Sequence, residues 1–166
     1  MLIRELHPTH DLAALTALQT EAQDYWLLAD GQCDPAQKAV AFFTDCPPHC
    51  DPAQSHRLGL FHDGKLSGPS LSGIAELSFG FPAPNDAYLG LMLLAPRLRG
   101  MGAGPILLAE IESRARGAQS PTLYLAVLEA NPRGRAFWQR MGFTPTGVTG
   151  HDADTGHILH RLAKPL

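Results

Sequence analysis

The segment Arg97–Gly104 (RLRGMGAG) constrains the fold most, because it sets three glycines and two arginines between a predicted strand and a predicted helix. The preceding Tyr88–Leu94 is nearly all apolar, which is typical of a strand buried on both faces. The helix that follows ends near Gly117 and carries two acid–base pairs at i,i+4 spacing. Glycines let several backbone N–H groups converge beside a helix N-terminus, so the segment predicts an anion-binding loop. The alternative is a sharp turn with two solvated arginines.

Spacing excludes two common phosphate-binding motifs. A P-loop has Lys-Ser or Lys-Thr after its last glycine, whereas Gly104 is followed by Pro105. A dinucleotide fingerprint, G-x-G-x-x-G, counted from Gly102 would need its third glycine where Leu107 stands. If the anion is a phosphate, we therefore expect a binding mode that is neither a P-loop nor a dinucleotide fingerprint.

The remaining patterns predict the element order β-α-α-β-β-β-α-β-α-β-β. Leu2–Leu6 is an opening strand, and apolar residues recur at helical spacing from Asp11 to Tyr25. Two further helices begin with an N-cap residue and a proline, at Asp34-Pro35 and Asn131-Pro132. The other strands are expected at His56–His62, from Lys65 onward after a primed turn at Asp63-Gly64, and at Ile74–Phe81, Leu123–Leu128, Phe143–Val148 and Ile158–Leu162. A mixed α/β sheet with helices on both faces satisfies this order.

The composition is that of a globular protein, with 45% hydrophobic and 17% charged residues. At roughly 150 residues per domain, the length predicts one domain over residues 1–166. The net charge of -3 disfavours nucleic-acid binding, and no apolar run reaches the roughly 18–20 residues that span a bilayer. The first residues, MLIRELHPTHD, lack the apolar core of a secretory signal. Three cysteines cannot all pair within the chain, so a reducing, cytoplasmic location is the simplest interpretation.

Two segments resemble the GNAT N-acetyltransferase family. The spacing Arg97-x-x-Gly100-x-Gly102 is similar to the acetyl-CoA loop of that family, whose pattern is Gln/Arg-x-x-Gly-x-Gly/Ala. Asn131–Phe143 (NPRGRAFWQRMGF) is similar to a later motif, in which Asn opens a helix that ends in Gly-Phe. The resemblance extends from about Tyr88 to Phe143. It implies a GNAT-like fold, a mixed and mostly antiparallel sheet whose central strands splay apart.

The resemblance implies acetyl-CoA as the acetyl donor. In that family the loop amides hold the pyrophosphate of coenzyme A, and the pantetheine arm lies like an added strand between the splayed strands, here Tyr88–Leu94 and Leu123–Leu128. For Asn131 plain helix capping is an alternative, and Arg133 and Arg135 also fit a solvated face. The residues expected to contact the donor are Leu91, Met92, Leu93, Arg97, Leu98, Arg99, Gly100, Met101, Gly102, Ala103, Gly104, Asn131, Arg135 and Trp138.

The implied reaction is direct attack of a neutral primary amine on the thioester in a ternary complex, with a base that removes a proton from the amine. Trp138 departs from the family pattern, in which many members carry at this position a tyrosine that protonates the departing sulfur. An indole N–H donates hydrogen bonds but has no accessible titration. Either the thiolate leaves without an acid, or another group serves, or Trp138 only packs beside the pantetheine.

Two carboxylates are candidate bases. Glu76 lies in an apolar strand, where an unpaired charge has to face solvent or a cleft because burial is costly. Glu129 stands at the end of the second splayed strand, two residues before Asn131. For each of them the alternative is a surface carboxylate.

The acceptor side is less defined. The resemblance places the first helices and the HDADTGH loop near the acceptor, so Asp24, Tyr25, Trp26 and His151 are expected to bind it. The acids here, with Asp30, favour a cationic acceptor such as a polyamine, an aminosugar or a peptide N-terminus, and solvated surface is the alternative. We expect a small-molecule or peptide amine as the partner, with no nucleic acid and no membrane. Many relatives are dimers, which leaves a homodimer open.

Cys46, His49 and Cys50 stand in a proline-rich segment, CPPHC, that could be interpreted as a zinc site. The Cys46–Cys50 spacing is inside the zinc range, but no second matched pair follows, so we expect no metal. Two rival functions remain open beside the acetyltransferase. One is an acyl-CoA sensor or scaffold of the same fold, and the other is a metal-binding or thiol-redox module built on CPPHC.

Overall fold

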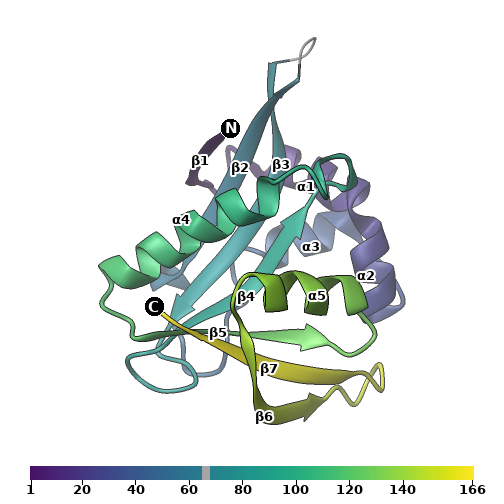
Figure 1. Ribbon diagram of the computed structural model, residues 1–166. Coiled ribbons are helices and arrows are strands. Elements are labelled where there is room, and N and C mark those ends of the chain that lie inside the picture. Colours follow the sequence, from purple (N-terminus) through teal and green to yellow (C-terminus); the bar gives the residue numbers. More distant parts are fainter. Residues whose placement is uncertain (65–67) are drawn as a thin grey trace.

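The computed structural model describes residues 1–64 and 68–166, which form a seven-stranded sheet and five α-helices (Figure 1). In chain order these are β1 (Leu2–Glu5), α1 (Leu12–Glu21), α2 (Gln23–Asp30), α3 (Pro35–Ala41), β2 (His56–Gly64), β3 (Gly68–Phe79), β4 (Ala87–Leu94), α4 (Ala103–Gly117), β5 (Thr122–Leu128), α5 (Pro132–Arg140), β6 (Thr144–His151) and β7 (Ile158–Pro165). The strands lie in the order β1-β2-β3-β4-β5-β7-β6, and β4 and β5 are parallel while the other neighbours are antiparallel. The predicted mixed, mostly antiparallel sheet is confirmed.

Helices cover both faces of the sheet. In Figure 1, α4 and α5 lie in front of the strands, and α1 and α3 lie behind them. The front core contains Leu107 and Ile111 of α4, and the rear core contains Leu15 and Leu18 of α1, all at most 1% exposed. Burial of these apolar side chains is the main force that fixes the layers. Within the described ranges, no helix is long and apolar enough to cross a bilayer.

The single helix predicted from Asp11 to Tyr25 is wrong, because the chain breaks at Ala22 into α1 and α2. Ala22 has φ -100° and ψ 22°, outside the helical region, and is fully buried. No proline or glycine marks this break in the sequence. The Trp26 indole donates to Oε1 of Gln19 at 2.6 Å across the break, so side-chain contacts hold α2 in a new direction.

The predicted hairpin turn at Asp63-Gly64 is also wrong, since both residues belong to β2 and pair with Pro69 and Gly68. The rest of that prediction, residues 65–67, lies outside the described residues. The strand predicted to begin at Ile74 is the second half of β3, which runs from Gly68 to Phe79 without interruption. Gly117, predicted just beyond its helix, is the last residue of α4.

An irregularity in β4 positions the site. Glu76 pairs with Leu91 and Leu77 pairs with Leu89, which leaves Gly90 as an extra residue. Such a β-bulge reverses the alternation of side chains between the two faces. Leu89 accordingly packs in the front core, and Leu93 packs in the rear core. The prediction that β4 is buried on both faces holds for its two ends, whereas Gly90 is exposed.

Candidate active site

The central strands separate at the bulge. β4 and β5 pair only from Ala87 to Leu89 on one strand and from Leu123 to Leu125 on the other. Beyond this point β4 continues to Leu94 with β3 on one side, and Figure 1 shows it diverging from β5. The β5-facing edge of β4 therefore presents backbone groups that no strand of the described chain occupies. An extended ligand with amide groups can pair with such an edge.

The glycine loop lies where β4 ends and α4 begins. Gly100 and Gly102 have φ of 77° and 82°, a backbone conformation that side chains with a Cβ rarely adopt. A Cβ at either position would have nothing within 4 Å, so backbone conformation and not space requires glycine. No side chain caps the N-terminus of α4, which leaves its first N–H groups available to an anion.

The other loop residues serve the core. Leu98 and Ala103 are buried, whereas Met101 is 66% exposed. A Cβ at Gly104 would lie 2.9 Å from Cε2 of Phe137, so this glycine permits α4 to pack against α5. The expected donor-binding segment is thus a short stretch around the exposed Met101, and the buried Leu98 and Ala103 hold its two ends in the core.

The two loop arginines bind carboxylates in this structure. Arg97 donates to both oxygens of Glu21 at 2.7 and 2.6 Å, and also to Ser72 at 2.8 Å. Arg99 forms an ion pair with Asp24. The expected phosphate contacts of these arginines would require the ion pairs to open. The backbone N–H groups of Leu98, Arg99 and Met101 already donate to carbonyl oxygens nearby, so the remaining donors of the loop are those of Gly100, Gly102, Ala103 and Gly104.

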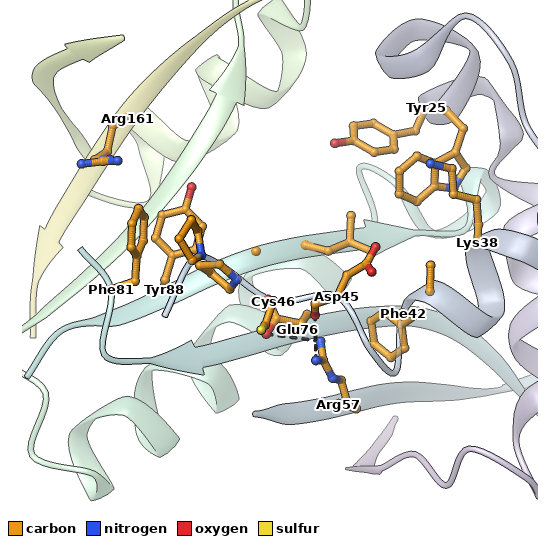
Figure 2. A pocket seen from close by; sticks show the side chains of 16 residues that line it. Tyr25, Lys38, Phe42, Asp45, Cys46, Arg57, Glu76, Phe81, Tyr88 and Arg161 are labelled. Carbon is orange, nitrogen blue, oxygen red and sulfur yellow. Dashed lines mark hydrogen bonds and ion pairs between the residues drawn. The ribbon is translucent and has the colours of Figure 1, made fainter. Parts of the chain in front are cut away.

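A pocket of about 400 Å³ opens beside the bulge (Figure 2). This volume is within the usual range for a small-molecule site. Aromatic side chains and five charged groups dominate its walls. Its lining residues are Tyr25, Trp26, Lys38, Ala41, Phe42, Asp45, Cys46, Pro47, Pro48, Arg57, Glu76, Phe81, Tyr88, Gly90, Leu91 and Arg161.

Glu76 is the buried acid of this pocket, with 4% of its surface exposed. Its carboxylate accepts a hydrogen bond from Ser78 and lies 3.2 Å from Nη1 of Arg57. Burial raises the pKa of the Glu76 carboxyl, while Ser78 and the charge of Arg57 oppose that rise. A Cβ at Gly90 would overlap Oε2 of Glu76, so the bulge glycine makes room for the carboxylate.

The sequence prediction missed Arg57, which is the direct cross-strand neighbour of Glu76. It is 5% exposed, and its Nη2 donates to the backbone oxygen of Asp45 at 2.7 Å. Its Nε and Nη1 have no hydrogen-bond partner in the described part of the chain. A lone arginine in an apolar strand was the available signal. Asp45, Phe42, Ser78 and Arg161 were missed as well.

The structure separates the other predicted residues. Tyr25 and Trp26 line the pocket, whereas Asp24 and His151 do not. Glu129 is half-exposed at its side chain and pairs with His160 at 3.3 Å, also outside the pocket. Of the two candidate bases, only Glu76 therefore lies in the cavity.

The α5 residues show local roles. Asn131 caps α5 by accepting from the N–H of Gly134 at 2.9 Å, which confirms its capping function. Trp138 is 9% exposed and packs edge-on against Phe137 and Phe143, with centroids 4.8 and 5.3 Å away. Arg135 is exposed. These contacts give Trp138 a packing role in the front core.

The CPPHC segment contains no assembled metal site. Sγ of Cys46 contacts the backbone oxygen of Cys50 at 3.2 Å, and all three cysteines are free. Over residues 1–64 and 68–166, no group of three or more His, Cys, Asp or Glu side chains is placed to hold a metal ion.

Comparison with solved structures shows the same architecture elsewhere. An acetyltransferase from Thermus thermophilus superimposes with a TM-score of 0.71 at 23% identity, over 100% of this chain and 98% of that chain. A PaiA N-acetyltransferase from Thermoplasma acidophilum, in complex with coenzyme A, gives 0.66 at 21% identity, over 99% and 98% of the two chains. The ribosomal-protein-S18-alanine N-acetyltransferase from Escherichia coli gives 0.65 at 17% identity, over 99% and 92%. At these identities the likeness shows the fold.

Sequence comparison supplies the family. No curated protein sequence matches the chain. The family model described as "Acetyltransferase (GNAT) family" matches residues 15–143, which include the glycine loop, the bulge and the α5 motif. The chain therefore belongs to the GNAT acetyltransferase family, which uses acetyl-CoA.

Proposed function

We propose that this chain is an N-acetyltransferase that moves the acetyl group of acetyl-CoA to a primary amine by direct attack in a ternary complex. The observation that carries the proposal is the position of Glu76. Its buried carboxylate lies in the pocket at Gly90, where β4 and β5 begin to separate. A base is thereby placed beside the edge where a thioester would enter.

The residues fit acetyl-CoA at two places. The uncapped N-terminus of α4, with Gly100 and Gly102 at positive φ, offers N–H donors to a pyrophosphate. The β5-facing edge of β4 from Gly90 to Leu94 offers backbone groups to pantetheine amides. When bound, acetyl-CoA supplies an acetyl thioester, whose C–S bond breaks as the new N–C bond forms. Leu91, Met92 and Leu93, which we expect to contact the donor, belong to this part of β4.

Glu76 is suited to accept a proton from the acceptor ammonium. Burial raises the pKa of its carboxyl, which strengthens it as a base. Ser78 and Arg57 hold the carboxylate in place, so it has little freedom to turn away from the pocket. Glu129 lacks these properties, because it is exposed and paired with His160.

Trp138 does not supply an acid in this proposal. Its indole packs with Phe137 and Phe143 in the front core, and an indole N–H does not titrate in the accessible range. The sulfur therefore leaves as a thiolate or takes its proton from another group.

The test is release of free coenzyme A from acetyl-CoA across a wide panel of amines. We expect turnover with at least one amine, and we expect Glu76→Gln to lower kcat by about 10²- to 10⁴-fold, the usual contribution of a general base. Glu129→Gln is the matched comparison, and it should change kcat little. Loss of the acidic limb of the pH–rate profile in Glu76→Gln alone would identify the base. Tight acetyl-CoA binding without thiol release for any amine would establish the acyl-CoA sensor instead.

A further inference from the structure

The charged side chains of the pocket are unequally paired. Lys38 forms an ion pair with a carboxylate of α2, and Arg57 lies 3.2 Å from Glu76. The other two charged residues of the wall are Asp45 and Arg161. In the ranges that the structure describes, the side chains of these two residues form no ion pair and no hydrogen bond. The pocket therefore presents one unpaired anion and one unpaired cation, and their positions decide which ligand can use them.

Arg161 marks one end of the pocket. It belongs to β7 and is partly buried, with its guanidinium 5.0 Å from the centroid of the Phe81 ring. Phe81 packs edge-on against Tyr88 at 5.0 Å, so the guanidinium rests on a fixed aromatic surface. Burial raises the pKa of the Tyr88 phenol and the charge of Arg161 opposes this rise, which places the cation within electrostatic reach of the cavity. A planar guanidinium in this position matches the geometry of a ligand carboxylate.

Glu76 and Asp45 lie at the other end. The backbone oxygen of Asp45 accepts from Nη2 of Arg57 at 2.7 Å, and Arg57 is also the neighbour of the buried Glu76 carboxylate. Figure 2 shows Arg161 on the far side of Tyr88 from Asp45. Because the acetyl group would arrive at the bulge beside Glu76, the amine of an acceptor has to enter at this end.

The distance between the two ends sets the length of the ligand. Glu76 belongs to β3, and its carboxylate lies over Gly90 of β4. Arg161 belongs to β7, and β5 separates β4 from β7 in the sheet. Neighbouring strands stand about 4.8 Å apart, so the base and the strand of Arg161 are roughly two spacings, or about 10 Å, apart. The lean of Arg161 toward Phe81 shortens this span, but an α-amino acid, whose two charges sit on one carbon, is still too short for it.

The wall between the two ends is apolar. It is formed by Leu91, Tyr88 and Phe81. The cavity of about 400 Å³ falls in the range of sites that enclose a whole small molecule. An extended chain covers about 3.3–3.6 Å per residue, so a body about two to three residues long spans the distance from the base to the guanidinium. A ligand that uses every part of the pocket carries an amine and an anion at opposite ends of an apolar body.

We infer that the acceptor is an elongated amino-carboxylate, a molecule with a primary amine at one end of an apolar body and a carboxylate at the other. The amine faces Glu76 and Asp45, the body lies along the apolar wall, and the carboxylate binds Arg161. This inference rests on the proposed function and names its substrate class. In the reaction the C–S bond of the thioester breaks and an N–C bond forms. The acceptor ammonium loses two protons, of which one ends on the thiol of coenzyme A and the other leaves through Glu76.

The experiment varies the distance between amine and carboxylate. Coenzyme A release from acetyl-CoA is measured with glycine, β-alanine, γ-aminobutyrate, ε-aminocaproate and ω-aminocaprylate, and with the alkylamine that each would give on loss of its carboxylate. The readout is the ratio of kcat/KM for each acid to that of its matched amine. We expect a ratio below one for glycine, because its carboxylate falls beside Glu76 and Asp45. The ratio should rise with length to roughly 10- to 100-fold at ε-aminocaproate or ω-aminocaprylate, the value of one charge-assisted pair.

Two variants separate the ends of the pocket. Arg161→Gln should bring the ratio for the long acids down to about one, mainly through KM, and leave the alkylamines unaffected, while Arg161→Lys should restore part of the ratio. Asp45→Asn acts at the amine end, so it should raise KM for each acid and its matched amine alike, by up to about fivefold for an exposed charge. Arg140→Gln is the control for loss of a positive charge, because Arg140 is exposed at the end of α5 outside the pocket.

Three results would overturn the inference and leave the proposed function intact. The first is a ratio that does not rise with length. The second is an equal loss on the long acids and on their matched amines in Arg161→Gln. The third is a peptide with an amidated C-terminus that is acetylated at its N-terminus better than every amino-carboxylate of the series.

Absence of thiol release with every amine would refute the proposed function, and binding then tests the inference separately. ε-Aminocaproate and pentylamine are titrated calorimetrically into the coenzyme A complex of the wild type and of Arg161→Gln. Tighter binding of the acid than of the amine, lost by roughly 10- to 100-fold in the variant, supports the inference. Equal binding of the two, or no binding of the acid to the wild type, overturns it.

Discussion

Replacing Gly90 with alanine should displace the Glu76 carboxylate and lower activity more than stability. A Cβ built at position 90 falls closer than 3.0 Å to Oε2 of Glu76 and 3.3 Å from its Cδ. Ordinary Cβ contacts begin at 3.4 Å. The carboxylate therefore has to retreat by about 1 Å, a displacement that can cost roughly 100-fold in rate. The overpacking itself should lower the free energy of unfolding by about 1–3 kcal/mol.

The assay is kcat/KM for coenzyme A release, measured together with thermal unfolding of the same preparations. For a domain of this size each kcal/mol shifts Tm by roughly 2–4 °C, so Tm should fall by about 2–12 °C. KM for acetyl-CoA should stay near the wild-type value, because the glycine loop is not altered and the substitution keeps the backbone N–H and C=O groups of β4. Gly117→Ala is the control, since a Cβ there meets nothing within 4 Å and the residue ends α4.

A double variant separates crowding from a change in the backbone. Without the Glu76 carboxylate the new methyl group displaces nothing, so Gly90→Ala should cost much less stability in a Glu76→Ala background. Contacting residues typically show coupling energies of about 0.5–3 kcal/mol. Additive effects on stability, or a Gly90→Ala variant with wild-type kcat/KM, would refute the reasoning.

Three further predictions concern the surroundings of the site. Gly104→Ala should lower the free energy of unfolding by up to about 2 kcal/mol in thermal melts. The clash with Phe137 at 2.9 Å costs about 1–3 kcal/mol, and the gain in helix propensity offsets about 1 kcal/mol of it. A more stable variant would show that α4 and α5 adjust freely. Asn131→Ala should lower the free energy of unfolding by about 1 kcal/mol through loss of the helix cap, and Asn131→Asp should lower it much less. A raised KM for acetyl-CoA in both variants would show that Asn131 also contacts acetyl-CoA. Arg4 lowers the pKa of Asp11 to about 2. The ion pair should therefore contribute about 1–2 kcal/mol to the free energy of unfolding, a value discounted for the exposure of Arg4. This contribution is present above the unfolded pKa near 3.8 and is lost as pH falls toward 2. Asp11→Asn should remove that pH dependence from urea unfolding curves, and an unchanged dependence would assign it to other groups.

The elements that sequence reasoning located are those with local signals. Asp34 caps α3 by accepting from two backbone N–H groups at 3.1 Å, and Asn131 caps α5 by accepting from one, that of Gly134, at 2.9 Å. Both caps are followed by proline, a pattern that depends on neighbouring residues alone. Glu110 and Arg114 form their predicted pair at 2.8 Å for the same reason. Local chemistry of this kind is independent of the rest of the fold.

The features that sequence reasoning missed depend on contacts between segments that are far apart in the sequence. The break at Ala22 is imposed by packing, because Leu15 and Leu18 lie inside the rear core, whereas Trp26 packs against that core, lines the pocket and lies under Nζ of Lys38. The apolar period runs through the break without interruption, so no sequence window reveals it. In β3 and β4 the bulges change which residues share a face, and alternation alone cannot locate an extra residue.

Pairing between charged residues of the site is even harder to predict from the sequence. Glu76 could be found from the sequence because an acid among apolar strand residues is conspicuous by itself. Its partner Arg57 is equally conspicuous, but their pairing follows from the register of β2 and β3, and that register contains a shift between Leu60 and Phe61. Asp24, which we expected to bind the acceptor, forms an ion pair with Arg99, and these two residues are 75 positions apart in the sequence. A sequence displays the sign of each charge, whereas the charge that a ligand meets is what remains after the fold has paired the rest.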